Sequence, residues 1–467
     1  MRNFHALAID LGQVLLGQAA LFWLTSLITV NLSPILNSAI NQQSSAIAMA
    51  ALVFAGCFAA WTMVSVIGLQ IQQELVLTDT QFSMLVASPL LSGALLRLPL
   101  GMLAERMVSR NLMLWLLVGV AVPLLLFSYA QEFWQYLLLG LAIGAAGSMF
   151  SVGVYFVSSR SDHHNQGLNL GIFGAGNIGA ALTNLVVPMI ILAYGWRAVP
   201  DIYAIALLVL AALFWILTSP SGDQNTTRIE PLTWQCQLQP LADARVWRFG
   251  LYYFFMFGGY IALALWLPGY YMNHYDLNIQ DASFLTLIFT LAGALSRILG
   301  GWFADHFGAR QVNWGVFWVS LVCLFFLSYP PTSLTIHGTQ GDISFDIAMP
   351  LWLFTVLIMV MGVAMGLGKA SVLRVVYDYY PDRMGTVAGT VGMLGAIGGF
   401  GLLISFGLMA DFIGVRSACF MLLYGLAVAC MCVMYYGISQ EQKRSRLQAA
   451  IRHNFLHDDS DIMDVET

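Results

Sequence analysis

Two arginines lie inside apolar stretches whose sequences resemble each other. The first stretch reads GALLRLPLGMLAE and begins at Gly93, with Arg97 near its centre. The second reads GALSRILGGWFAD and places Arg297 at the same position. A guanidinium is always charged in proteins and matches planar oxyanions with two parallel hydrogen bonds. The repeat therefore indicates a pair of anion-binding arginines, one in each half of the chain.

The composition is that of a membrane protein. Of 467 residues, 59% are hydrophobic and only 9% are charged, whereas soluble domains carry about 25% charged residues. A run of roughly 20 apolar residues is long enough to cross the hydrocarbon core as a helix. Twelve runs of this kind are found, at residues 47–70, 81–103, 112–130, 133–158, 167–194, 199–218, 247–271, 282–304, 312–330, 347–370, 385–410 and 415–438. The sequence predicts an all-α integral membrane protein.

Several classes of function are excluded by what the polar segments contain. The largest polar stretch, residues 219–246, is too short for a soluble catalytic domain. The six cysteines form no CxxC pair and the eight histidines fall in loops and tails, so we expect no metal and no cofactor. The glycine- and lysine-containing loop that binds ATP phosphates is also absent. We therefore expect neither an enzyme nor an ATP-driven pump.

Basic residues predict the orientation. Thirteen of the 19 Lys and Arg residues fall on one side of the membrane if loops alternate, and two, Arg197 and Arg416, fall on the other. Cytoplasmic loops carry the excess of positive charge, so the first side and the C-terminus are expected in the cytoplasm, with the protein in a bacterial inner membrane. Residues 1–46 are expected to form an N-terminal extension with an extra membrane-associated helix.

A second repeat divides the chain into two halves. GAGNIGAALTNLVVPMIILAYGWRA is echoed by MLGAIGGFGLLISFGLMADFIGVRSA, so that Gly176 and Gly179 match Gly395 and Gly398. Parallel repeats of six helices are the plan of major facilitator transporters, which bind substrate near the midplane between the halves. The predicted organisation lists an N-terminal bundle at 47–218, a cytoplasmic linker at 219–246, a C-terminal bundle at 247–438 and a cytoplasmic tail at 439–467.

The buried arginines need a counter-charge. An arginine at mid-bilayer depth costs at least about 2.5–3.5 kcal/mol, and no Asp or Glu lies within a helix core. One alternative is that each guanidinium bonds helix-end carbonyls or a carboxylate and serves packing only. We favour an external counter-charge, a small anion that is the transported substrate.

The glycine-rich motifs GAGNIG and GMLGAIGGF, with GALLRLPLG, GALSRILGG and FGGYIALALWLP, resemble the nitrate/nitrite porter family of the major facilitator superfamily. The resemblance implies that Arg97 and Arg297 clamp nitrate or nitrite and that Asn177 hydrogen-bonds it. It also implies an aromatic wall of Tyr253, Phe257 and Phe150. The glycines expected to allow close helix packing and movement are Gly171, Gly174, Gly176, Gly179, Gly392, Gly395, Gly398 and Gly399. The residues expected at a cytoplasmic gate are Glu105, Arg106, Arg110 and Asp305.

Lys369, in GLGKASV, is the remaining basic residue inside a predicted helix. The resemblance associates a lysine at this position with proton-coupled nitrate uptake, and burial makes a lysine titratable. Nitrate/nitrite antiport stays open, as does transport of another small anion such as a monocarboxylate, or a receptor that signals through the tail. The expected partners are nitrate or nitrite, protons and membrane lipid, with no nucleic acid, and the protein is expected to be a monomer.

Overall fold

The computed structural model describes residues 42–77, 79–218, 234–330, 332–338, 341–413, 415 and 417–463. The extra helix expected in the N-terminal extension lies outside these residues. Within them the chain is almost entirely helical, as expected for a bilayer, where each backbone N–H and C=O must find its partner inside the segment.

Six crossings precede the linker. Four of them are single helices and two are composite, because a short irregular turn joins two helical pieces end to end. The elements are α3 (Gln42–Leu75), α4 (Asp79–Ala104), α5 (Ser109–Phe127), α6 (Phe133–Ile143) joined by η1 (Gly144–Ser148) to α7 (Met149–Ser158), η2 (His163–Asn165), α8 (Gln166–Gly174) joined by η3 (Ala175–Asn177) to α9 (Ile178–Tyr194), and α10 (Ala198–Leu217).

Six crossings follow the linker, and a β-hairpin interrupts them. The elements are α11 (Trp234–Leu238), η5 (Gln239–Ala242), α12 (Ala244–Tyr253) joined by η6 (Phe254–Gly258) to α13 (Gly259–Tyr275), α14 (Ile279–Phe303), η7 (Ala304–Gly308), α15 (Ala309–Leu327), β1 (Thr332–Gly338), β2 (Gly341–Ile347), α16 (Leu351–Tyr379), η8 (Pro381–Arg383), α17 (Met384–Ile413) and α18 (Ala418–Met463).

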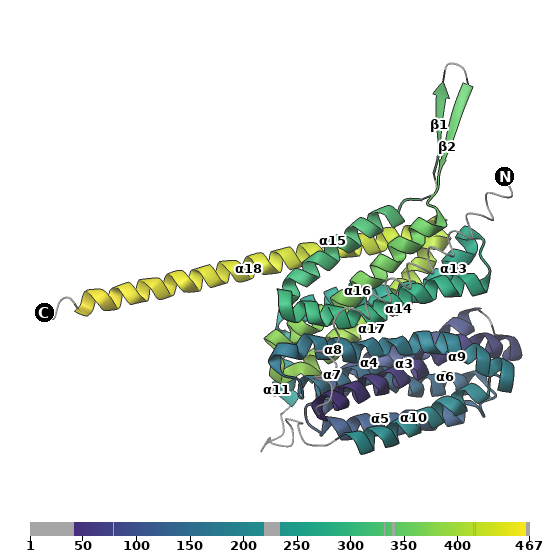
Figure 1. The fold of residues 1–467 in the computed structure, drawn as a ribbon, viewed down its shortest axis with the longest axis horizontal. Coiled ribbons are helices and arrows are strands. Elements are labelled where there is room, and N and C mark those ends of the chain that lie inside the picture. Colours follow the sequence, from purple (N-terminus) through teal and green to yellow (C-terminus); the bar gives the residue numbers. More distant parts are fainter. Residues whose placement is uncertain are drawn as a thin grey trace.

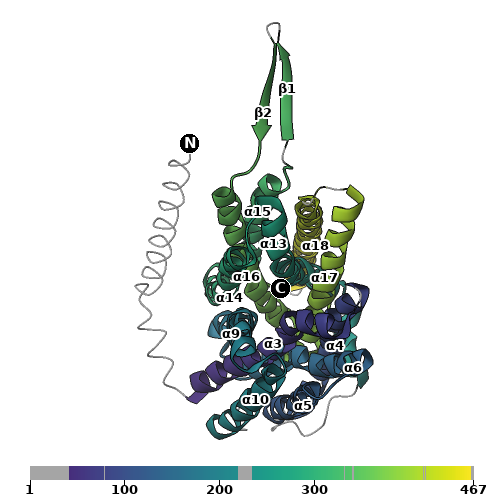
Figure 2. The same cartoon turned by 90° about the vertical axis from the view of Figure 1, so that its right-hand side faces the viewer.

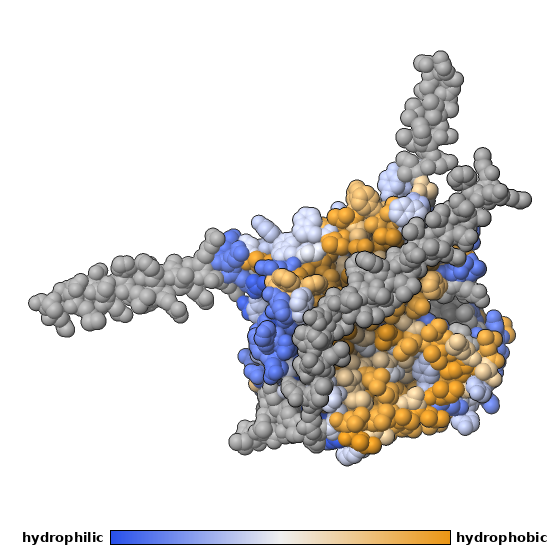
Figure 3. Space-filling model, viewed as in Figure 1, coloured by the Kyte–Doolittle hydropathy of each residue, from blue (hydrophilic) through white to orange (hydrophobic). Residues whose placement is uncertain are grey.

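The predicted number of crossings is confirmed. Among the described residues, 11 apolar segments are long enough to span a membrane, and one of them, Phe284–Leu327 with 44 residues, includes most of α14 and all of α15. Large apolar side chains such as Trp115, Leu192 and Ile216 are exposed on the outside of the bundle. Figure 3 shows apolar side chains over the middle of one face and hydrophilic ones toward the end from which α18 emerges. This surface matches a hydrocarbon layer.

The helices before and after the linker lie on opposite sides of the molecule (Figures 1 and 2). They meet mainly along two helix pairs, α4 with α17 and α8 with α14. We call the end of the bundle that carries α11 and the α18 extension the linker end. The opposite end, from which β1 and β2 project, is the hairpin end (Figure 1).

Two elements differ from the expected all-α plan. Residues 332–347 form an antiparallel hairpin in which Thr332 pairs with Ile347 and Gly338 with Gly341. Polar and apolar residues alternate in SFDI of β2, which is the period of a strand, and the segment is too short to cross a bilayer. The tail expected from residue 439 continues α18 as a helix to Met463, which extends away from the bundle (Figure 1).

Irregular turns interrupt three helices near the contact between the halves. The 3-10 turns η1 and η3 break the crossings of α6–α7 and α8–α9, and the π turn η6 breaks α12–α13. Such turns shift the hydrogen-bond ladder and redirect side chains, and π turns are frequent at functional sites. The three turns contain or adjoin residues of the predicted anion site.

Candidate functional site

Arg97 of α4 is fully buried, and only two of its three guanidinium nitrogens have hydrogen-bond partners. Its Nε donates to the carbonyl oxygen of Gly147 in η1 at 3.1 Å, and its Nη1 donates to that of Gly392 in α17 at 2.7 Å. Nη2 has no hydrogen-bond partner although the side chain is 0% exposed. The two carbonyls hold the guanidinium in place from both halves, and Nη2 remains available to a ligand.

Three aromatic rings surround the same guanidinium. The Cζ of Arg97 lies 5.6 Å from the ring centroid of Trp61, 5.1 Å from that of Phe150 and 5.0 Å from that of Phe257. A cation close to a ring face is attracted by the ring quadrupole. The rings therefore stabilise the buried charge without neutralising it.

Arg297 of α14 is also 0% exposed and has fewer partners. Its Nη2 donates to the hydroxyl of Tyr253 at 3.4 Å, while Nε and Nη1 have no hydrogen-bond partner. Its charge repels that of Arg97. The two guanidiniums thus lie close together in the core, and three of their nitrogen atoms have no hydrogen-bond partner. An anion between them would stabilise this arrangement.

Aromatic contacts connect the two arginines. The rings of Phe150 and Tyr253 are 5.9 Å apart, and those of Tyr253 and Phe257 are stacked at 5.4 Å. Tyr253 and Phe257 come from both ends of the π turn η6. The structure therefore brings the predicted aromatic residues together with Arg97 and Arg297.

Asn177 ends the 3-10 turn η3 and is 2% exposed. Neither its Oδ1 nor its Nδ2 has a hydrogen-bond partner. It follows Gly174 by three residues, and residues three apart share a helix face. A Cβ on Gly174 would overlap the guanidinium of Arg297, so the unsatisfied amide lies one turn along the face that meets Arg297.

The predicted glycines divide into groups that pack against different neighbours. Gly171 and Gly174 lie against Arg297, and a Cβ on Gly392 would lie 2.7 Å from the ring of Phe150. A second group packs within one half, Gly176 and Gly179 against α3, and Gly395, Gly398 and Gly399 against the segment from Tyr253 to Ile261. Only the first group adjoins the arginines across the contact between the halves.

Two carboxylates join the halves at the linker end. Glu105 follows α4 and accepts hydrogen bonds from the backbone N–H of Thr386, at 2.6 Å, and from its hydroxyl, at 2.9 Å, in the first turn of α17. Asp305 of η7 accepts from the backbone N–H groups of Gly167, at 2.9 Å, and Leu168, at 2.8 Å, in the first turn of α8.

Each carboxylate therefore caps a helix of the opposite half, where unpaired N–H groups and the helix dipole favour a negative charge. The matching positions of Glu105 and Asp305 in the two repeats make the pair of contacts pseudo-symmetric. In this structure they join the two halves at the linker end.

The two basic residues predicted at the gate, Arg106 and Arg110, contact different partners. Arg106 donates from Nε to the side-chain oxygen of Gln237 at 2.6 Å, so it contacts α11, which lies within the predicted linker. Arg110 donates to the carbonyl of Trp215 at 2.7 Å and to the hydroxyl of Thr218 at 3.1 Å. These bonds connect α5 to the end of α10 inside one half.

Several residues of this region were not singled out by the sequence. Gln237 donates to the Glu105 carboxylate at 3.1 Å, and Arg374 donates to that of Asp305 at 2.7 Å. Trp61, which faces Arg97, donates to the carbonyl of Pro89 at 2.7 Å. None of these residues belongs to a repeated motif. The one available signal was the indole of Trp61 inside an apolar span, because the N–H of a buried indole usually has a hydrogen-bond partner.

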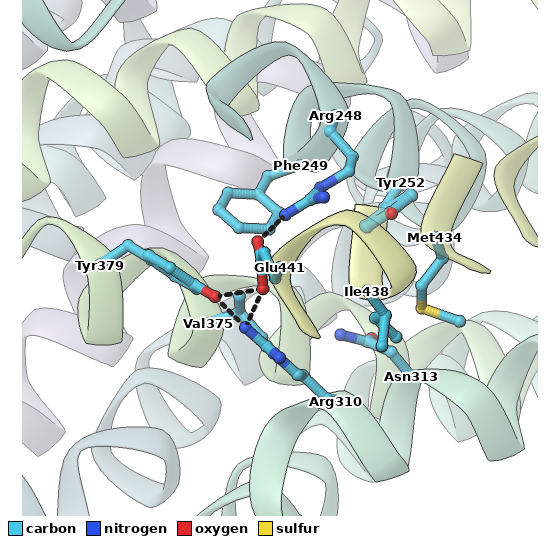
Figure 4. Close-up of a pocket in the computed structure, with 10 residues that line it drawn as sticks. All are labelled: Arg248, Phe249, Tyr252, Arg310, Asn313, Val375, Tyr379, Met434, Ile438 and Glu441. Atoms are coloured by element: carbon cyan, nitrogen blue, oxygen red, sulfur yellow. Dashed lines mark hydrogen bonds and ion pairs between the residues drawn. The ribbon is translucent and has the colours of Figure 1, made fainter. Parts of the chain in front are cut away.

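A further pocket lies at the linker end of the second half (Figure 4). Glu441 of α18 accepts hydrogen bonds there from Arg248 at 2.8 Å, Arg310 at 2.5 Å and Tyr379 at 3.0 Å. The carboxylate thus joins the start of the α18 extension to α12, α15 and α16. It joins helix ends within the second half.

The described residues form twelve apolar crossings with large apolar side chains exposed on the outside of the bundle, which defines a multi-pass integral membrane protein. The chain belongs to the Major Facilitator Superfamily, whose family model matches residues 14–401. The superfamily consists of transporters, as predicted, and the protein is not an enzyme.

Relatives confirm the resemblance to nitrate/nitrite transporters. The chain is 36% identical over 392 residues to the "Probable nitrate/nitrite antiporter NarK1" of Thermus thermophilus, covering 81% of this chain and 88% of that protein. It is 28% identical over 359 residues to the "Nitrite extrusion protein" of Bacillus subtilis, covering 77% and 85%. The match to the "Probable nitrate transporter NarT" of Staphylococcus epidermidis is 27% over 342 residues, covering 73% and 82%.

Solved structures confirm the fold. The crystal structure of the major facilitator transporter FucP in the outward conformation superposes with a TM-score of 0.65 at 14% identity, over 85% of this chain and 99% of that chain. The human organic anion transporter MFSD10 gives a TM-score of 0.64 at 14% identity, over 84% and 99%. At this identity the likeness shows the fold alone.

Proposed function

We propose that this transporter moves nitrate, and nitrite as a second substrate, between Arg97 and Arg297. The observation that carries the proposal is the pair of fully buried guanidiniums whose described hydrogen bonds involve carbonyls and a phenol but no carboxylate. A small planar anion supplies the missing negative charge and accepts from the free N–H groups. The unsatisfied amide of Asn177 adds a donor.

The glycine contacts support a small substrate. A Cβ on Gly392 or Gly174 would overlap a residue of the site, so backbone and side chains already approach as closely as their atoms allow. The aromatic rings of Phe150, Tyr253 and Phe257 close the site from solvent, since each is at most 1% exposed. This packing favours an anion of a few heavy atoms over a larger carboxylate.

The proposed transport cycle rocks one half against the other. Residues 47–218 and 247–438 are the moving halves, and residues 219–246 link them. The helix caps made by Glu105 and Asp305 hold the linker end closed, and they must break when that end opens. We place the linker end and the C-terminus in the cytoplasm of a bacterium, because the basic loops lie there.

Coupling to protons is the favoured energy source. A monovalent anion entering a negative cell interior moves against about 2.3 kcal/mol per 100 mV, so accumulation needs a cotransported cation or an exchanged anion. Lys369 of α16 is 0% exposed and its Nζ has no hydrogen-bond partner. It is the candidate for a group that gains and loses a proton during transport.

Nitrate/nitrite exchange is the second candidate. Arg297 and Arg97 repel each other when no anion is bound between them. This repulsion favours a cycle in which the transporter changes conformation only with an anion bound, which is exchange. The name of the relative from Thermus thermophilus also points to antiport.

Uptake of isotopically labelled nitrate into proteoliposomes separates the candidates. We expect that acidifying the outside drives net uptake by the wild type. Lys369→Ala is expected to lose this uptake while retaining exchange of external nitrate for internal nitrite. If wild-type uptake requires internal nitrite and ignores the pH gradient, antiport replaces symport. If an excess of formate or acetate competes as well as nitrate does, the substrate is a different small anion.

A further inference from the structure

Lys369 faces an aromatic ring inside the second half. Its Nζ lies 3.2 Å from the ring centroid of Tyr260 in α13. Tyr260 is 3% exposed, and the lysine itself is fully buried. The ammonium has no hydrogen-bond partner, so the ring face is its nearest source of negative potential among the contacts described.

The ring of Tyr260 is held in place from three directions. Its hydroxyl donates to the carbonyl of Thr290 in α14 at 2.6 Å. Its ring lies 5.2 Å from that of Phe289. Gly293 leaves room for it, since a Cβ there would overlap the ring edge. These contacts with α14 hold the ring with its face toward Lys369 of α16. The tyrosine side chain therefore loses no further conformational entropy when the lysine becomes charged.

The charges around Lys369 make this contact important. The charge of Arg297 in α14 opposes a second positive charge at Lys369. The carboxylates of α14 and α16 are Asp281 in the first turn of α14 and Asp378 in the last turn of α16, and α13 has none. No carboxylate on these three helices therefore lies near the middle of the bundle to offset the ammonium.

We propose that Tyr260 is the positioning residue of Lys369 and that its ring face stabilises the protonated amine within the bundle. The proposal rests on the coupling role given to Lys369 above and adds the group that sets the pH range in which coupling operates. A desolvated cation on an aromatic face is strongly stabilised. Without the ring, protonation of Lys369 requires a higher proton concentration.

Tyr260→Leu tests this directly. We expect the pH midpoint of proton-driven nitrate uptake to move to lower pH by about one unit or more, a change of about tenfold in proton affinity. Tyr260→Phe keeps the ring and loses only the bond to Thr290, so its midpoint is expected to remain within a few tenths of the wild-type value. Tyr271→Leu removes another fully buried tyrosine ring of α13, which contacts Tyr275 and Phe354, and it is the matched control for altered packing.

Exchange of nitrate for internal nitrite, measured on the same proteoliposomes, reports whether each variant is folded and inserted. An acid shift in Tyr260→Leu alone supports the proposal. Equal midpoints in Tyr260→Leu and Tyr260→Phe, with wild-type uptake driven by protons, overturn the role of Tyr260 and leave symport standing. A wild type without proton-driven uptake overturns both. If Tyr260→Leu is inactive in exchange, Tyr260→Phe and Tyr260→Trp test the ring in its place. An unchanged midpoint in Tyr260→Phe together with an acid shift in Tyr260→Trp, which also keeps an aromatic ring, refutes the ring face as the determinant.

Discussion

Gly174→Ala probes the anion site with a single methyl group. The new Cβ would lie 2.6 Å from Nη2 of Arg297 and closer still to Nε and Cζ. Ordinary van der Waals contact requires about 3.5 Å, so the guanidinium must move by about 1 Å. The obstructing atoms are the far end of a flexible side chain, and the helix itself is improved by alanine. We therefore expect a folded protein with a displaced Arg297.

The displacement should weaken anion binding. Loss of one hydrogen bond between a guanidinium and an anion corresponds to about 1.5–3 kcal/mol. The apparent KM for nitrate is then expected to rise roughly 10- to 150-fold. The assay is initial-rate exchange of labelled nitrate in proteoliposomes, with the amount of inserted protein measured in the same samples.

The matched control is Gly401→Ala in α17, where an added Cβ has no neighbour within 4 Å. This variant introduces the same chemical change in a helix of the bundle and should keep the wild-type KM. If Gly174→Ala also keeps a KM within twofold of that control, Arg297 does not bind the anion in the position described.

Three further outcomes follow from the site and the linker end. Arg97→Lys is expected to abolish uptake while leaving the protein folded, because an ammonium lacks the planar fork that bonds Gly147, Gly392 and an anion together; near-normal uptake contradicts the clamp. Asn177→Ala should raise the KM for nitrate roughly 10- to 150-fold, because the lost hydrogen bond contributes about 1.5–3 kcal/mol of binding free energy. An unchanged KM assigns the amide to packing. Burial raises the pKa of Glu105, so this carboxyl group holds a proton more tightly when the linker end is closed than when it is exposed to solvent. The stability of the closed state relative to the open state should therefore fall as pH rises through that raised pKa. Distances between spin labels on the ends of α4 and α17 measure this, Glu105→Gln should remove the pH dependence, and a pH dependence that persists in this variant assigns the effect elsewhere.

The two caps at the linker end also show how a sequence repeat produces matching contacts between the halves. Glu105 and Asp305 end corresponding motifs in the two halves, and each caps the first turn of a helix in the other half. Both contacts depend on the same relative position of the halves, so we expect them to form and break together. Arg374 adds a charged bond to Asp305 but not to Glu105, and Gln237 takes that place beside Glu105.

Much of the architecture could be predicted from the sequence. Helix length and hydropathy are local properties, and a bilayer leaves an apolar run of 20 residues with few alternatives to a spanning helix. The number of crossings and the superfamily followed from this pattern and from the repeated motifs. Arg97 and Arg297 could be selected because a permanent charge inside an apolar run has a cost that needs an explanation.

Tertiary structure alone decided which atoms of those residues are satisfied. Arg97 bonds the carbonyl of Gly392 across 295 residues of sequence, and this bond leaves Nη2 as its free donor. The hairpin at residues 332–347, the capping of α8 and α17 by opposite halves, and the ring of Tyr260 beneath Lys369 likewise had no counterpart in the sequence analysis. Each depends on how separate helices dock against one another, and docking is set by the summed packing of many side chains, whereas the hydropathy and spacing that can be read along a chain describe one helix at a time.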